Sequence, residues 1–152
     1  MSRVDFYHLQ MQNLEQVLPK LLEKAYSTGQ TILVKVGNEE RVEFLNSQLW
    51  TYNDTSFIPH GSRKDGFGDQ QPIWLTSGND NPNNALLLFL VDGASSSLDE
   101  LSKFERIFNI FDGNNQSSVE QARRFWKELK AADGMEAYYW KQDENGRWTQ
   151  AA

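Results

Sequence analysis

The octet RRFWKELK, at residues 123–130, brings four basic side chains and a tryptophan together in a chain whose formal net charge is −6. Guanidinium and ammonium groups pair with carboxylates and phosphates, and an aromatic ring beside them adds apolar contact area. The octet is therefore either the charged outer face of a helix or a binding site for a negatively charged ligand. The residues concerned are Arg123, Arg124, Trp126, Lys127 and Lys130, with Glu128 as the acid among them.

Helical spacing gathers three of these cations on one side. Successive residues of an α-helix advance by about 100°, so Arg123, Lys127 and Lys130 form one basic stripe. Arg124 falls beyond the edge of that stripe. The face predicted to meet the core contains Ala122, Phe125 and Leu129.

Trp126 is expected at the border between the stripe and the core, with Val119 on the same side of the helix. Under one hypothesis it covers the core below a solvated basic face, as on most surface helices. Under the other, the border binds a peptide with acidic and apolar groups, because Arg and Trp dominate the energetics of many interfaces. Direct DNA binding by the octet is a third hypothesis, which the net acidity disfavours.

Length and composition limit the class of protein. The 152 residues suit one domain, residues 1–152. The chain has no cysteine, which excludes disulfides and thiol chemistry and fits a cytoplasmic protein. The apolar run ALLLFLV, at residues 85–91, has the length of a strand rather than of a membrane span. The N-terminus lacks the apolar run of a signal peptide.

The hydrophobic pattern predicts an α/β fold with a mostly parallel central sheet flanked by helices, Rossmann-like but without a nucleotide-binding motif. The segment Thr51–Gln71 is predicted to be a long loop, functional or mobile, and residues 143–152 to be a frayed tail. Strands are expected at Val4–Leu9, Thr31–Val36, Pro72–Thr76, residues 85–91 and Glu136–Lys141. Helices are expected at residues 14–25, at Glu39–Trp50, from Ser97 to about Ile110, and from a capping box of Ser117 with Glu120 through the octet.

Motifs for phosphate chemistry are missing from the sequence. No G-x-x-x-x-G-K-[ST] is present, and Glu39 and Glu40 follow the second strand where they would repel a phosphate. Asp92 follows an apolar strand and could hold magnesium, although a lone carboxylate there is more often a turn residue. A small nucleotide- or metal-binding enzyme that uses the strand-end crevice near Asp92 is the alternative function.

Other catalytic patterns are missing too. The two histidines, His8 and His60, are expected to be a packed strand residue and a loop fastener. No G-x-S-x-G elbow and no metal-ligand spacing occurs. We therefore expect no intrinsic catalysis and no cofactor.

Two segments resemble a known family. ARRFWKELKAADG, at residues 122–134, resembles the A-R-x-x-[YW]-K-x-[YL]-[KR]…G helix of the chi subunit of bacterial DNA polymerase III. QLWTYNDTSFIPHG, at residues 48–61, resembles the L-W…F-[IV]-P-H segment of that family. FYHL, PIWL, LLLFLVDG and YYW follow in the family's order, so the resemblance covers nearly the whole chain. It implies a nucleotide-binding-like fold without nucleotide chemistry and an accessory role in the clamp-loader complex of the polymerase holoenzyme.

The resemblance also implies a partner. Chi binds the acidic C-terminal tail of the single-stranded DNA-binding protein, which ends in an apolar Pro-Phe, so association with DNA would be indirect. Trp126 stands where Tyr is common in the family, which keeps an apolar wall but loses a phenol hydrogen bond. The tail-binding residues predicted here are Phe111, Val119, Arg123, Trp126, Lys127 and Lys130.

A second interface follows from the same resemblance. In relatives the L-W…F-x-P-H block belongs to the surface that binds psi, the small protein that links chi to the clamp loader, and a helicase-like partner docks there as well. Trp50, Phe57 and Pro59 are the matching residues of this chain. The alternative for Trp50 and Phe57 is burial in the core.

Overall fold

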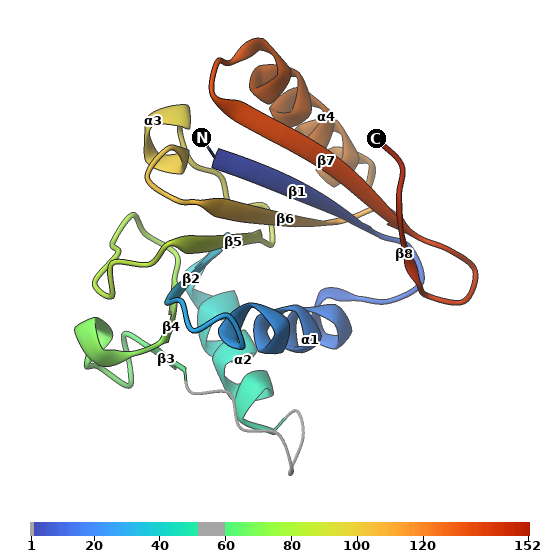
Figure 1. Ribbon diagram of the computed structural model, residues 1–152. Coiled ribbons are helices and arrows are strands. Elements are labelled where there is room, and N and C mark those ends of the chain that lie inside the picture. Colours follow the sequence, from blue (N-terminus) through green and yellow to red (C-terminus); the bar gives the residue numbers. More distant parts are fainter. Residues whose placement is uncertain (1, 52–59) are drawn as a thin grey trace.

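The structure is a computed structural model that describes residues 2–51 and 60–152, and it contains one sheet with helices on both faces (Figure 1). Within those ranges the strands follow the order β3-β4-β2-β5-β6-β1-β7-β8 across the sheet. Every pairing is parallel except that of β7 with β8. The predicted α/β fold with a mostly parallel sheet is confirmed. The strands are β1 (Ser2–Leu9), β2 (Ile32–Val36), β3 (Gly61–Ser62), β4 (Ile73–Thr76), β5 (Leu87–Val91), β6 (Arg106–Asp112), β7 (Met135–Gln142) and β8 (Trp148–Gln150).

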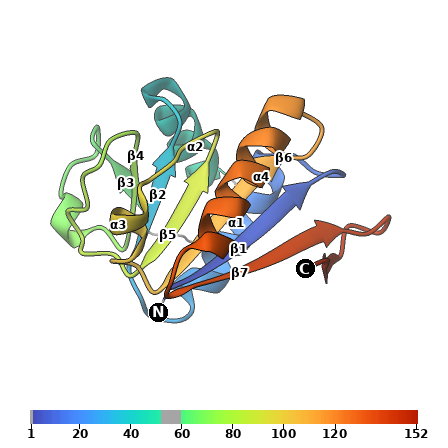
Figure 2. The same ribbon diagram turned by 90° about the horizontal axis from the view of Figure 1, so that it is seen from above.

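Helices α1 and α2 cover one face of the sheet, and α3 and α4 cover the other (Figure 1, Figure 2). Side chains alternate between the two faces of a strand, so the sheet separates two layers of core. Val17 and Leu45 belong to the first layer, and Ala122 and Leu129 belong to the second. No helix in the described ranges is long and apolar enough to cross a membrane. The helices are α1 (Leu14–Tyr26), α2 (Glu39–Thr51), α3 (Leu98–Leu101) and α4 (Gln116–Ala131).

Strand β1 lies between β6 and β7, because α4 connects those two strands across it. The register places His8 of β1 beside Phe111 of β6 and beside Lys141 of β7. Residues from three distant parts of the sequence therefore meet at the carboxyl end of β1.

The segment after Ser97 differs from the prediction of one helix that reaches Ile110. Ser97 does cap a helix, since its Oγ accepts a hydrogen bond from the amide of Glu100 at 3.3 Å, but α3 ends at Leu101. Beyond it, RIFNIFD forms β6, which is paired on both edges with β5 and β1. Aromatic and β-branched residues favour such a strand, which makes the predicted helix wrong here.

The cap of α4 is also different from the one predicted. Asn115 is the N-cap, and its side chain accepts a hydrogen bond from the amide of Ser118 at 3.0 Å. The helix thus begins at Gln116, just before the predicted capping residue Ser117. Asn and Ser are both strong N-caps, so sequence alone did not separate the two starts.

The two segments that were predicted to lack regular secondary structure contain short strands and a 3₁₀ turn. Trp148–Gln150 pair with β7 as strand β8, so the tail at residues 143–152 is not simply frayed. The predicted loop Thr51–Gln71 includes β3 and a 3₁₀ turn at Gly68–Gln70.

A buried carboxylate joins β1 to both of its neighbours. Asp5 is fully buried, and its oxygens accept hydrogen bonds from Arg3, from Arg106 at 2.9 Å and from the indole of Trp140 at 2.9 Å. Arg3 and Arg106 are register partners, so their charges would repel each other without Asp5. The two guanidinium groups also stack on Tyr138 and Phe108.

Replacing this carboxylate should destabilise the fold. We expect Asp5→Asn to lower the free energy of unfolding by roughly 3 kcal/mol, near the lower end for breaking a buried ion pair because both arginines reach solvent. Urea unfolding monitored by tryptophan fluorescence measures the change. Asp69→Asn is the control, because Asp69 is exposed and should shift stability by less than about 0.5 kcal/mol. Equal stabilities of the two variants would contradict the role given to Asp5.

Candidate functional site

Helix α4 lies against β1 with its apolar side and presents the octet on its outer side. Ala122 and Leu129 are buried, and Phe125 is partly buried against Phe6 of β1, with ring centroids 5.3 Å apart. The predicted core face of the octet is confirmed by these contacts.

Trp126 occupies the border that the helical wheel predicts for it. Its ring contacts Phe6 edge-on at 5.4 Å and Tyr139 of β7 at 6.0 Å between centroids. The ammonium group of Lys130 lies 4.9 Å from the centre of the indole ring. Trp126 is thus fixed from below by aromatic contacts and covered in part by a cation.

The remaining cations of the octet are exposed and unpaired. Within residues 2–51 and 60–152, the basic partners in ion pairs are Arg3, Lys35, Arg41 and Arg106. None of the α4 cations joins such a pair. Their charges therefore stay available to an anionic ligand.

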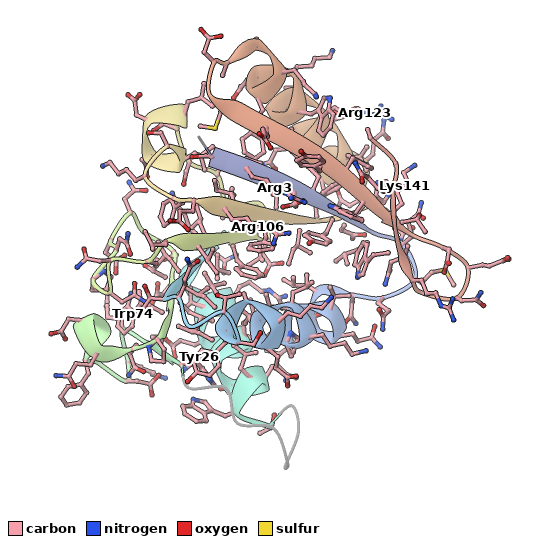
Figure 3. All side chains as sticks on the ribbon, in the orientation of Figure 1. Arg3, Tyr26, Trp74, Arg106, Arg123 and Lys141 are labelled. Carbon is pink, nitrogen blue, oxygen red and sulfur yellow. The ribbon has the colours of Figure 1, made fainter. Side chains whose placement is uncertain are left out.

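Beside α4, the carboxyl ends of β1 and β7 add polar groups that were not among the predicted site residues. A ring nitrogen of His8, Nδ1, lies 2.5 Å from the hydroxyl of Tyr139. Lys141 lies at the same end of β7, with its ammonium group 6.0 Å from the centre of the Tyr139 ring. Figure 3 labels Arg123, in the middle of α4, and Lys141, near the carboxyl end of β7. The alternation of β7 predicts that Tyr139 and Lys141 share one face, but only the order and register of the strands in the structure place that face beside His8.

Phe111 and Val119 lie beneath the outer side chains of α4 and β7. Phe111 is 8% exposed, and its ring contacts His8 at 5.0 Å and Tyr139 at 6.0 Å. Val119 is partly buried against the same core layer. Of the six predicted tail-site residues, these two form the apolar floor, and the other four form the outer face of α4.

The electrostatic environment of His8 reflects the nearby cations. Burial lowers the pKa of His8, Lys141 and Arg123 lower it further, and Asp112 opposes them. Burial raises the pKa of Tyr139, and Arg123 opposes that shift. Arg123 therefore lies close enough to act on both rings. The surface formed by Arg123, Trp126, Lys127, Lys130, Tyr139 and Lys141, with the buried His8 beneath it, is called the α4–β7 surface below.

The second predicted interface is described only in part, because Phe57 and Pro59 lie outside the described residues. Trp50 is 50% exposed near the end of α2, and its ring lies 4.1 Å from that of His60. Burial of Trp50 in the core is therefore excluded. Phe44 on the same helix is also exposed, under the guanidinium of Arg41, and it was not among the predicted interface residues. His60 is a fastener, as expected, because it is buried with Nε2 3.1 Å from the carbonyl oxygen of Asn46.

A crevice with a volume of about 1020 Å³ lies at the carboxyl ends of the strands. This is the place where the alternative hypothesis of a nucleotide- or metal-binding enzyme puts its site. Asp92 lines the crevice but is paired with Arg41, whose Nε lies 2.8 Å from Oδ2, and Arg41 also pairs with Glu15 at 2.6 Å. Among the described residues there is no group of three or more His, Cys, Asp or Glu side chains that could hold a metal ion. Arg124 lines this crevice, so it lies away from the other cations of the octet.

Comparison with known proteins finds one family model, that of the DNA polymerase III chi subunit, HolC, which matches residues 1–136. A probable DNA polymerase III subunit chi from Rickettsia prowazekii is 34% identical over 91 residues, which cover 60% of this chain and 55% of that protein. A DNA polymerase III subunit chi from Pseudomonas aeruginosa is 30% identical over 91 residues, which cover 58% of this chain and 63% of that protein. The matches thus span less than two thirds of the length of either relative.

The environment of His8 predicts a pH dependence of stability. Because the folded state lowers its pKa below the ordinary value of about 6.5, the unfolded chain binds the proton more tightly. The contribution of neutral His8 to the free energy of unfolding is therefore fully present above pH ~6.5. It is lost as the pH falls through the pKa of His8 in the folded state. Urea unfolding between pH 7.5 and 5 should show this loss, and His8→Gln should reduce it. An NMR titration that places His8 at or above 6.5 would contradict the expectation.

Proposed function

Because the chain belongs to the family of DNA polymerase III chi subunits, a replication accessory subunit, we propose that its α4–β7 surface binds the acidic C-terminal tail of the single-stranded DNA-binding protein. The chain would then be a cytoplasmic adaptor without catalysis of its own. It would connect the polymerase to DNA coated by that partner, and its own association with DNA would be indirect.

The observation that supports this proposal most is the group of unpaired cations around a fixed aromatic ring. Arg123 and Lys127 form no ion pair with any residue that the structure describes, and Lys130 packs over Trp126, whose ring is held by the core beneath it. An acidic peptide with an apolar end fits both features. The cations would attract and orient its carboxylates, and the aromatic border would bury its terminal ring.

The proposed mechanism needs little rearrangement of the protein. Trp126 is already oriented by Phe6 and Tyr139, so a ligand would not have to order it on binding. The long basic side chains would lose rotamer freedom, which limits the affinity that their charges add. We therefore expect moderate binding that weakens as the salt concentration rises.

A second surface supports the role of an adaptor. Trp50 and Phe44 are exposed on α2, which covers the face of the sheet opposite to α4. We propose that Trp50, with Phe57 and Pro59, contacts psi or an equivalent clamp-loader protein, or a helicase-like partner. Because α2 and α4 lie on opposite faces, two partners could be held at once.

Fluorescence anisotropy of a labelled acidic peptide that ends in Pro-Phe tests the tail site. Arg123→Ala and Lys127→Ala should each cost about 1.5–3 kcal/mol if a hydrogen bond to a carboxylate is lost, which corresponds to roughly 10- to 150-fold weaker binding. Trp126→Ala should also weaken binding, once urea unfolding shows that this variant is folded. Arg124→Ala is the matched control, because Arg124 is the neighbouring arginine but faces the crevice.

The outcomes separate the three hypotheses for the octet. Saturable binding that Arg124→Ala leaves intact and Arg123→Ala weakens would support the tail site. An absence of peptide binding by the wild type at low salt would make the octet an ordinary solvated face. Binding of single-stranded DNA through the same residues, without binding of the peptide, would overturn the proposal in favour of a direct DNA contact.

A further inference from the structure

Lys141 adds a cation to the α4–β7 surface from a second element. It belongs to β7, in register with His8 of β1, while Arg123 belongs to α4. The ammonium group of Lys141 lies 6.0 Å from the centre of the Tyr139 ring, and that ring contacts Trp126 of α4 at 6.0 Å between centroids. Lys141 therefore lies at the border of β7 with the octet, and its charge and that of Arg123 both lower the pKa of His8. Lys141 is exposed and forms no ion pair among the described residues.

The balance of charge around His8 is positive. Of the charged groups that act on its ring, Lys141 and Arg123 are cations and Asp112 is the acid. Glu128 of α4 lines the crevice on the other side of the helix, and Glu120 accepts a hydrogen bond from Gln116 at 3.4 Å. Cations that converge without matching acids repel each other, and a bound carboxylate removes that repulsion.

The polar groups beneath the two cations are incompletely paired. His8 is 7% exposed, and its second ring nitrogen, Nε2, is buried without a hydrogen-bond partner in the described structure. Its first ring nitrogen is engaged by the hydroxyl of Tyr139. The aromatic rings of Phe111 and Tyr139 flank His8 on the adjacent strands. This part of the α4–β7 surface thus has an aromatic floor and a positive rim.

We propose that Lys141 is a specificity-determining residue of the tail site, and that an acidic peptide crosses from α4 to β7 with carboxylates held by Arg123 on one side and Lys141 on the other. This inference rests on the proposed function. It differs from a site confined to α4, where the peptide would follow the stripe of Arg123, Lys127 and Lys130 along the helix. The crossing path requires acidic groups far enough apart along the peptide to reach both elements.

A double-mutant cycle with the labelled acidic peptide tests the crossing path. Lys141→Gln should weaken binding about three- to tenfold, less than the loss of a fully desolvated charge, because Lys141 is exposed. The loss should be smaller in an Arg123→Ala background, since the two residues would hold one ligand segment together. Lys20→Gln, at an exposed position of α1 on the opposite face, is the matched control and should leave the affinity unchanged.

The pKa of His8 provides a second measurement, because it responds to carboxylates bound beside this ring and not to a change in charge elsewhere on the protein. The chain has only two histidines, so the ring signals are readily assigned by NMR. Bound carboxylates should raise the pKa of His8 by offsetting the two cations, while the signals of His60 should stay unchanged. The same titration with Lys141→Gln should show a smaller rise on peptide binding.

The results distinguish failure of this inference from failure of the proposed function. If the wild type does not bind the peptide, both fail. If the peptide binds and depends on Arg123, but Lys141→Gln has the affinity of Lys20→Gln and His8 does not respond, the peptide lies along α4 and the crossing path is overturned. Coupling between Arg123 and Lys141 together with a response of His8 supports it.

Discussion

Parallel pairing of β1 with both β6 and β7 is the constraint on which the rest of the structure depends. It buries Asp5 between two arginines on one face of the sheet. On the other face it brings His8 beside Phe111 and Lys141, and Phe6 beneath Trp126. The same strand therefore fixes the centre of the fold and the floor of the candidate site.

The distribution of paired and unpaired cations gives an acidic chain a local basic surface. On and near β1, Arg3 and Arg106 are neutralised in part by one buried carboxylate. Within residues 2–51 and 60–152, the basic side chains of α4 and β7 have no such partner. Net charge describes the protein at long range, whereas binding at an exposed site depends on charges within about a Debye length of 8–10 Å. A net charge of −6 is thus compatible with recognition of an acidic peptide.

Much of the fold could be predicted from the sequence, and the failures have physical causes. The strands and helices whose hydrophobic residues repeat with one clear period were predicted. The helical wheel also placed Trp126 and the buried face of α4 correctly. Strand β6 was missed, because RIFNIFD is buried on both sides and its period is ambiguous directly after a true cap at Ser97. The contribution of Lys141 could not be seen either, because only the order of the strands in the sheet places β7 beside β1 and α4.

The contact between His8 and Gly113 has a consequence for the orientation of α4. A methyl group at position 113 would lie 2.0 Å from Nε2 of His8 and 2.5 Å from the carbonyl oxygen of Leu9, so only glycine fits there. The chain passes from Gly113 to the cap at Asn115 within two residues. The backbone therefore passes close to the imidazole directly before the N-cap of α4, so the path of the chain is constrained where the helix starts. A shift of one residue in that start would turn the helix by about 100°, enough to move its basic side away from β7 while leaving each amino acid unchanged.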